Sequence, residues 1–236
     1  DDDDDERGGG RGEPPTAAGT NRFSWDLRHA GPTTFPDMIM WSAGSNGPRA
    51  LPGRYMIRLK VDDRPVLTQS FEYRLNPRAP DITLEDVQAQ HELAMRVRDA
   101  ASAANEGVVA IRDVTEQVEH RIEQDGTVEQ SGDVLTRKLG TVEEELYQVR
   151  NRSNQDPLNY PIRLNNRIAA LLGVVEGVPG RPTRQSYQVF DELNEELRVQ
   201  LDALHRIIND DLNEFNALLR SKGLEPVIVP GTRPIT

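Results

Sequence analysis

Four histidines are the side chains best suited to metal binding or proton transfer, and their spacing gives no metal motif. They are His29, His91, His120 and His205. No two stand three or four residues apart, the spacing that places two imidazoles on one helix face for a shared metal. The chain also has no cysteine, which excludes disulfides and thiolate metal sites. We therefore predict structural or surface histidines, and neither a metal nor another cofactor.

Clustered carboxylates are the second group of residues that could do chemistry. Glu143, Glu144 and Glu145 stand in one predicted helix, and Asp210 and Asp211 in another. A glycosidase needs two carboxylates that face each other across a cleft. Neighbouring acids on one helix are instead typical of a solvated face. We predict no catalytic residue and no enzymatic activity.

Amide side chains are concentrated in the block 151–166. Its members are Asn151, Asn154, Gln155, Asp156, Asn159, Asn165 and Asn166. One interpretation is a polar recognition surface for carbohydrate or protein. The other is structural, because Asn and Asp cap helix ends and hold loops through bonds to the backbone. The second is favoured at a helix–loop–helix corner, and Asn154, Asn159 and Tyr160 are kept as candidate protein contacts.

The stretch 35–41, FPDMIMW, is more apolar than an alternating strand requires. Exposed methionine and aromatic side chains at one edge of a domain mark a protein contact. We therefore name four further contact candidates in this stretch: Phe35, Met38, Met40 and Trp41. Trp25 is explained by packing in a core.

Residues 21–75 have the pattern of β-structure. Apolar and polar residues alternate from Phe23 to Leu27 and again from Tyr55 to Val61, as in half-buried strands. Pro52-Gly53 is a turn signal, and Asp62-Asp63 predicts a tight turn between two strands of a hairpin. About five short strands in this length are typical of a small immunoglobulin-like antiparallel β-sandwich.

From Thr83 onward the apolar period becomes helical. Thr83 with Asp86 predicts a capping box at the start of a long helix that reaches residue 122. We expect two short helices, at about 133–151 and from Pro161, which can take the first helical position, and a fourth from Thr183 to about Lys222. Leu and Val spaced by four and three residues predict coiled-coil-like seams. The result is an elongated antiparallel four-helix bundle that tapers into a two-helix arm.

The predicted fold class is therefore α+β with two domains. An acidic, glycine-rich linker (1–20) precedes the sandwich (21–75). A proline-rich hinge (76–82) leads into the bundle (83–222), and a proline-rich tail (223–236) follows, whose valines 227 and 229 are expected to extend a sheet edge. We expect no transmembrane segment, because no apolar run reaches the roughly 18–20 residues that span a bilayer. The five opening aspartates suggest a mature product or a fragment.

The net charge of the chain limits the classes of partner that it can bind. The formal net charge is -11, and residues 1–6 contribute much of it. Nucleic-acid binding needs a basic stripe that replaces counterions, and a polybasic membrane anchor needs clustered lysine and arginine. We therefore expect no nucleic acid as a partner, and look to other proteins.

Three stretches resemble a known family. They are FSWDLRHAGPTTFPDMIMWSAGSNGPRALPGRYMIRL (23–59), EEELYQVRNRSNQDPLNYPIRLNNRIAALLGVVEG (143–177) and RPTRQSYQVFDELNEEL (181–197). They look like the C-terminal region of exported bacterial proteins with a sortilin-like or BNR-type β-propeller, often labelled glycosyl hydrolases. The resemblance covers about residues 21–220, and 154–166 is its most distinctive part. In that family the propeller would carry any glycosidase chemistry, so no catalytic residue is carried over. The resemblance implies a sandwich, a helical tail and an extracytoplasmic location.

The chain also resembles the membrane-extrinsic polypeptides of the RC-S type, which help to hold a bacterial photosynthetic reaction centre within its light-harvesting ring. We therefore expect a non-catalytic periplasmic structural subunit, peripheral to a membrane. It would brace a larger complex through contacts with other protein subunits, such as a reaction centre and its light-harvesting ring. The alternative is an accessory C-terminal domain of a propeller-type glycosyl hydrolase that binds carbohydrate or protein.

Overall fold

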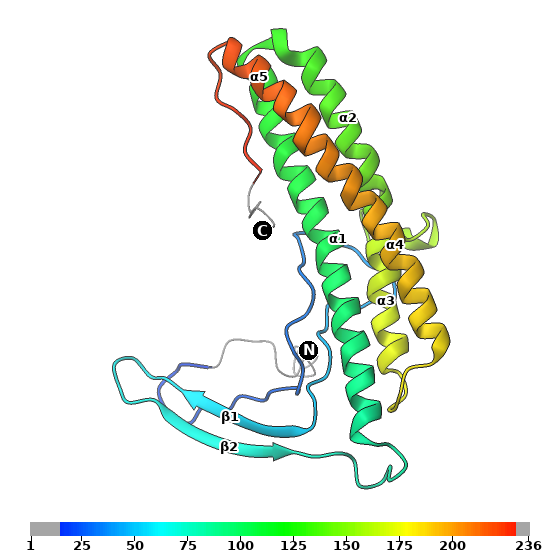
Figure 1. Ribbon diagram of the computed structural model, residues 1–236. Coiled ribbons are helices and arrows are strands. Elements are labelled where there is room, and N and C mark those ends of the chain that lie inside the picture. Colours follow the sequence, from blue (N-terminus) through cyan, green and yellow to red (C-terminus); the bar gives the residue numbers. More distant parts are fainter. Residues whose placement is uncertain (1–14, 230–236) are drawn as a thin grey trace.

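The computed structural model describes residues 15–229, in which a helical bundle stands beside one β-hairpin (Figure 1). The hairpin projects sideways from the end of the bundle where α1 begins. Short η segments join or continue the helices. In chain order the elements are β1 (Gly53–Leu59), β2 (Leu67–Tyr73), α1 (Leu84–Gln124), η1 (Gly126–Val128), α2 (Glu129–Leu146), η2 (Asp156–Leu158), α3 (Leu164–Glu176), α4 (Arg184–Arg206), η3 (Ile207–Leu212) and α5 (Asn213–Ser221).

The long helix α1 is the central rod of the bundle. Its start confirms the predicted capping box: Thr83 accepts a hydrogen bond from the Asp86 N–H, and the Asp86 carboxylate accepts one from the Thr83 N–H. These bonds satisfy N–H groups that have no partner within the helix. Its buried face is rich in alanine and valine, which allows the other helices to approach closely.

The other helices follow in the predicted order of long, short, short and long, but the predicted four-helix bundle that tapers into a two-helix arm is wrong. The two short helices do not pair side by side: α2 lies along one half of α1 and α3 along the half where α1 begins (Figure 1). The seam of α2 is buried as expected at Leu135, Leu139, Val142 and Leu146. Its helix nevertheless runs earlier than 133–151, because Asp125 caps the short turn η1 and the chain reverses at once. Thr183 caps α4 as predicted. The last rod contains a π-helical turn, η3, between α4 and α5.

The predicted immunoglobulin-like sandwich is wrong. In the described part of the chain, the only sheet has two antiparallel strands, β1 and β2, paired from Gly53 with Tyr73 to Leu59 with Leu67. The hairpin itself is confirmed. The alternation at 23–27 does not produce a strand, because Leu27 adopts a positive φ of 58° and the Asp26 side chain accepts a hydrogen bond from the Arg28 N–H.

The stretch 34–41 is also no strand. Asp37 has a φ of 58°, and the Met38 N–H donates to the Phe35 carbonyl in a turn. Its apolar side chains cover the helical core: the Phe35 ring meets the Tyr147 ring edge-on at 5.0 Å, and Met38 and Met40 pack against the buried cluster. The high apolar content of 35–41 therefore reflects contact with helices.

The tail corrects a further expectation. Val227 to Val229 join no sheet; instead the Asn216 side chain binds both the N–H and the carbonyl of Val227, at 2.7 and 3.0 Å. Gln117 binds both backbone groups of Ile228 in the same manner.

Pro161 does not begin α3 either, and its carbonyl accepts a hydrogen bond from Gln148. Among the described residues, no helix combines the length and apolar character that crossing a bilayer requires.

Candidate functional site

One face of the hairpin carries exposed apolar side chains. In an antiparallel pair, directly opposed residues share a face and alternate residues point to opposite faces. The register places Gln69, opposite Ile57, and Tyr73 on one face together with five apolar residues that we call the hairpin face: Tyr55, Ile57, Leu59, Leu67 and Phe71. Ile57, Leu59 and Leu67 are 57%, 53% and 65% exposed. Large aliphatic side chains thus stand side by side in solvent.

The base of the hairpin face is covered by the N-terminal segment. The Trp25 ring packs edge-on against Tyr55 at 5.4 Å and Phe71 at 6.3 Å, and these two rings stack at 5.6 Å. The Trp25 indole N–H donates to the Arg28 carbonyl. This aromatic cluster fixes the base of the hairpin, while the half toward the loop keeps its aliphatic side chains uncovered.

The backbone edges of the hairpin are open along the strands. Within residues 15–229, β1 and β2 pair only with each other. Residues 27–29 pair with 48–50 just before β1, through an isolated bridge between Arg28 and Arg49. A two-stranded hairpin is marginally stable alone, and unpaired strand edges are templates for another strand.

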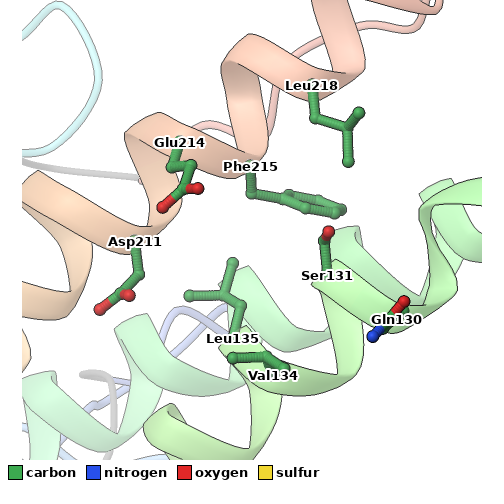
Figure 2. A pocket seen from close by; sticks show the side chains of 8 residues that line it. All are labelled: Gln130, Ser131, Val134, Leu135, Asp211, Glu214, Phe215 and Leu218. Atoms are coloured by element: carbon green, nitrogen blue, oxygen red, sulfur yellow. The ribbon is translucent and has the colours of Figure 1, made fainter.

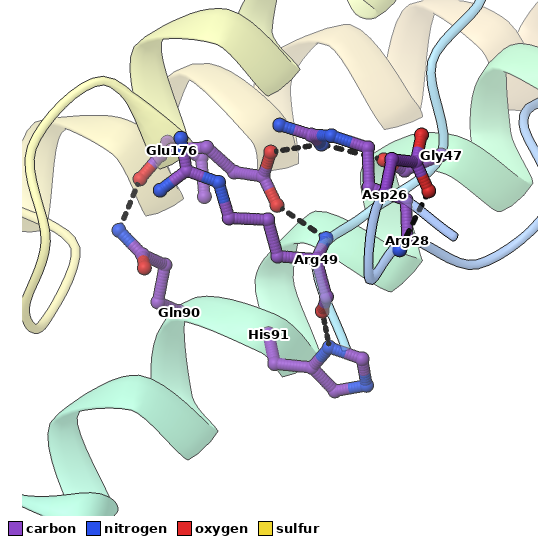
Figure 3. Close-up of polar contacts among 8 residues, drawn as sticks. Asp26, Arg28, Gly47, Arg49, Gln90, His91 and Glu176 are labelled. Atoms are coloured by element: carbon purple, nitrogen blue, oxygen red, sulfur yellow. Dashed lines mark hydrogen bonds and ion pairs between the residues drawn. The ribbon is translucent and has the colours of Figure 1, made fainter. Parts of the chain in front are cut away.

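Glu176 fixes the hairpin base to the bundle (Figure 3). Its buried carboxylate, at the end of α3, accepts hydrogen bonds from Arg28 Nη1 and from the Arg49 N–H, both at 2.7 Å. Arg28 Nη1 also donates to the Gly47 carbonyl. Gln90 on α1 donates to the Val175 carbonyl at 2.7 Å, next to Glu176. The Glu176 carboxylate therefore holds both partners of the isolated β-bridge, Arg28 and Arg49.

Two histidines meet at the same junction, which sequence spacing does not predict. The rings of His29 and His91 lie 5.0 Å apart between centroids. His91 Nδ1 lies 2.8 Å from the Arg49 carbonyl, and since a carbonyl only accepts, this nitrogen carries the proton. Burial, together with the charges of His91 and Arg98, lowers the pKa of His29. The pair is formed only by folding, since the two residues stand 62 positions apart in the numbered chain.

A groove of ≈ 490 Å³ lies between α2 and the end of the last rod (Figure 2). Figure 2 shows Phe215, Leu218 and Leu135 beside Asp211 and Glu214. Both carboxylates come from the same rod, and Asp211 is bound by Lys138 Nζ at 2.5 Å. This is not the arrangement of two carboxylates across a cleft that glycoside hydrolysis uses. Within the described residues, no three His, Cys, Asp or Glu side chains could hold a metal ion.

The first four predicted contact residues lie on the bundle. Phe35 is buried, between the Tyr147 ring and the Arg112 guanidinium, whose carbon lies 4.8 Å from the Phe35 centroid. Met38 and Met40 are half-buried against the core. Trp41 is partly exposed, and Asn166 binds its N–H and its carbonyl at 2.6 and 2.9 Å. Trp41 is thus the member of this group whose ring is most available to a partner.

The amide-rich block 151–166 contains exposed and buried side chains, and the two groups have different roles. Asn154 and Asn159 are exposed in the corner between α2 and α3, where the Asp156 carboxylate accepts from the N–H groups of Arg152 and Ser153. Tyr160 is half-buried beneath the Arg150 guanidinium. Asn165, by contrast, is buried and donates to Asn105 across the bundle at 3.0 Å. The buried members therefore have the structural role, and Asn154 and Asn159 remain available at the surface.

Sequence reasoning did not single out the hairpin face. The alternation at 55–61 predicts a strand of a sandwich, in which the apolar residues face a core. The number of strands decides their exposure: within residues 15–229 the sheet consists of β1 and β2, and no second sheet covers its apolar face. Comparison with known proteins adds no assignment, since no family model, curated protein or solved structure matches the chain.

Proposed function

We propose that this chain is a non-catalytic structural subunit that holds other proteins in a larger assembly, with the hairpin face as its docking surface. The observation that supports this most directly is the set of adjacent exposed residues Ile57, Leu59 and Leu67 on one side of an isolated hairpin. Contiguous exposed apolar side chains on a folded protein mark interaction sites.

The energetics favour an occupied hairpin face. Burying one exposed aliphatic side chain contributes about 1.5–3 kcal/mol. Three such side chains, with the aromatic cluster of Trp25 beside them, form an apolar centre of the kind found in protein interfaces. The same partner would stabilise the hairpin, which on its own has too few strands for independent stability.

The bundle supplies the rigid part of a brace. At 1.5 Å per residue, a helix as long as α1 extends over roughly 60 Å. The hairpin base is fixed to α3 by Glu176, so a partner held at the hairpin is linked to the whole rod. Trp41 and the exposed corner at Asn154 and Asn159 lie elsewhere on the bundle and are proposed as a second contact region.

We further propose a periplasmic location at the periphery of a membrane complex. The support is the resemblance to exported bacterial proteins and to membrane-extrinsic reaction-centre polypeptides. The partners in this proposal are protein subunits of such a complex, with the reaction centre and its light-harvesting ring as the named case.

The test is co-purification from detergent-solubilised membranes of the source organism with a tagged chain. Leu67→Asp is compared with Ile228→Asp. Ile228 is the matched control, because it is 67% exposed against 65% for Leu67 and lies in the C-terminal tail, outside the hairpin. We expect Leu67→Asp to lose the companion subunits and Ile228→Asp to keep them. Equal recovery by both variants, or recovery of the wild-type chain alone, contradicts the proposal.

A further inference from the structure

The two edges of the hairpin differ in how they are protected. On the β1 side the N-terminal segment approaches, with the Ala50 N–H donating to the Leu27 carbonyl at 2.7 Å, and Figure 1 shows this segment on that side of the hairpin. β1 itself carries Arg54 and Arg58. Charged residues on an edge strand are a common protection against strand addition. The β1 edge is therefore the better protected of the two, although β1, like β2, pairs with no third strand among the described residues.

The β2 edge has no such protection. The strand LTQSFEY contains no lysine, arginine or proline. Its single charge, Glu72, is paired with Arg74 at 2.5 Å. Within the described chain no backbone group pairs with this edge. Its residues suit a strand, with Leu67 and Phe71 on the hairpin face and Thr68 and Ser70 on the other.

The charges around β2 indicate what kind of strand would fit. Three cations, Arg58, Lys60 and Arg64, lie at the loop end of the hairpin together with two carboxylates, Asp62 and Asp63. None of the five forms an ion pair with a described residue, and residues 58–64 carry a net charge of +1. Arg58 is opposite Thr68, on the face away from Ile57 and Leu67. A strand added at β2 would lie two strand spacings from β1, roughly 10 Å, which the combined length of an arginine and a glutamate can bridge.

We propose that the outer edge of β2 binds an extended segment of the partner protein as a third strand, with apolar residues on the hairpin face and acidic residues on the opposite face. This inference rests on the proposed function and adds the recognition chemistry of the docking site. Main-chain hydrogen bonds give such a contact its affinity, and the alternating side chains give its specificity. The added strand extends the apolar face beyond Leu67 and Phe71 and brings carboxylates to the unpaired cations.

Amide hydrogen exchange of the co-purified complex against the free chain tests the added strand. In an antiparallel pair, alternate residues direct their N–H groups toward the partner strand or outward. We expect the outward amides of β2 to exchange roughly tenfold or more slower in the complex, with no comparable change at the outward amides of β1. Unchanged outward β2 amides in a complex that Leu67→Asp still disrupts would overturn the strand and leave the proposed function standing.

Proline variants give a second readout. Gln69 and Ser70 are neighbours in β2, so one of them has the outward N–H and the other pairs with β1. Exchange in the free chain identifies the outward one. Proline there removes an edge donor and leaves the hairpin paired. We expect that variant to bind the partner at least tenfold more weakly, while its melting temperature stays near that of the wild type. Binding as strong as that of the wild type overturns the inference.

A charge reversal tests the acidic face of the strand. Arg58→Glu is expected to weaken association several-fold, and Arg78→Glu, an exposed cation outside the hairpin, to leave it unchanged. Equal behaviour of the two variants overturns the acidic assignment. Protection of β2 that rises with the concentration of the purified chain alone would identify a second copy as the occupant, and this too overturns the inference.

Discussion

Glu176, the last residue of α3, accepts a hydrogen bond from Arg28 Nη1 at 2.7 Å, across 148 positions of the chain. Its other carboxylate oxygen accepts from the Arg49 N–H. One buried side chain therefore joins the end of a bundle helix to both segments that lead to the hairpin. The orientation of the proposed docking surface depends on this junction.

Glu176→Gln is expected to loosen the junction. The variant leaves Arg28 without its charged partner in a largely buried position, which costs about 2 kcal/mol of unfolding free energy. Urea unfolding followed by Trp25 and Trp41 fluorescence measures the change. Glu195→Gln is the control, because the Glu195–Arg198 pair lies on the exposed face of α4 and its loss should leave the unfolding midpoint unchanged. Equal midpoints for all three proteins would contradict the role of Glu176.

Gly47 allows two loop segments to approach each other closely. A Cβ atom on Gly47 would lie 2.0 Å from the His29 carbonyl oxygen and 2.4 Å from that of Ala30, so the backbone itself must move. We expect Gly47→Ala to cost roughly 2–3 kcal/mol. At Gly53, where a Cβ meets nothing within 4 Å, the same change should have little effect. Thermal unfolding of the two variants makes the comparison, and similar melting temperatures would refute it.

Asn216 holds the tail against the bundle. Asn216→Ala removes both hydrogen bonds to Val227 and leaves the buried backbone groups of that residue unsatisfied. The expected loss is about 2–3 kcal/mol, with faster proteolytic cleavage between residues 223 and 229. Asn213→Ala is the matched control, since Asn213 is exposed and bonds only to the Asn209 carbonyl of its own rod. A tail as resistant to protease in Asn216→Ala as in wild type would be the contrary result.

Partial burial of His29, with the charges of His91 and Arg98 beside it, makes stability depend on pH. The pKa of His29 is below its ordinary value of 6.5, so the unfolded chain binds the proton more readily than the folded one. Folding stability is therefore full above about pH 6.5 and declines as the pH falls through that value toward the lowered pKa. Urea midpoints measured from about pH 7.5 to about pH 5.5 should fall more steeply in wild type than in His29→Gln. Parallel pH profiles would contradict this assignment.

The helical region and the hairpin were predictable because their signals are local. The capping residues Thr83 and Thr183 and the apolar spacing of Leu135, Leu139 and Leu146 all act within a few residues, and the structure agrees with them. The turn at Asp62-Asp63 likewise joins two strands that are close in sequence. Helix ends were less accurate, because η1 reverses the chain within three residues.

The remaining interactions depend on residues far apart in the chain. The alternation at Phe23 and Trp25 has the period of a strand. A strand also needs a neighbouring strand for its backbone hydrogen bonds, and the positive φ of Leu27 changes the direction of the chain, so that residues 23–26 form no such pairing. The apolar stretch around Phe35 and Met40 could be buried either in a second sheet or against a helix. The sequence does not distinguish these two cases. In the structure the stretch packs against the helical core at Tyr147.

The sequence by itself determined the helices of the bundle, their caps and the hairpin, because hydrophobic period and turn chemistry depend on residues that are neighbours in the chain. Only the tertiary structure decided that no second sheet covers the hairpin within residues 15–229, that Ile57 and Leu67 therefore face solvent, and that Glu176 fixes the hairpin base. The physical reason is that burial is a property of what packs against a side chain, and those neighbours come from distant parts of the chain.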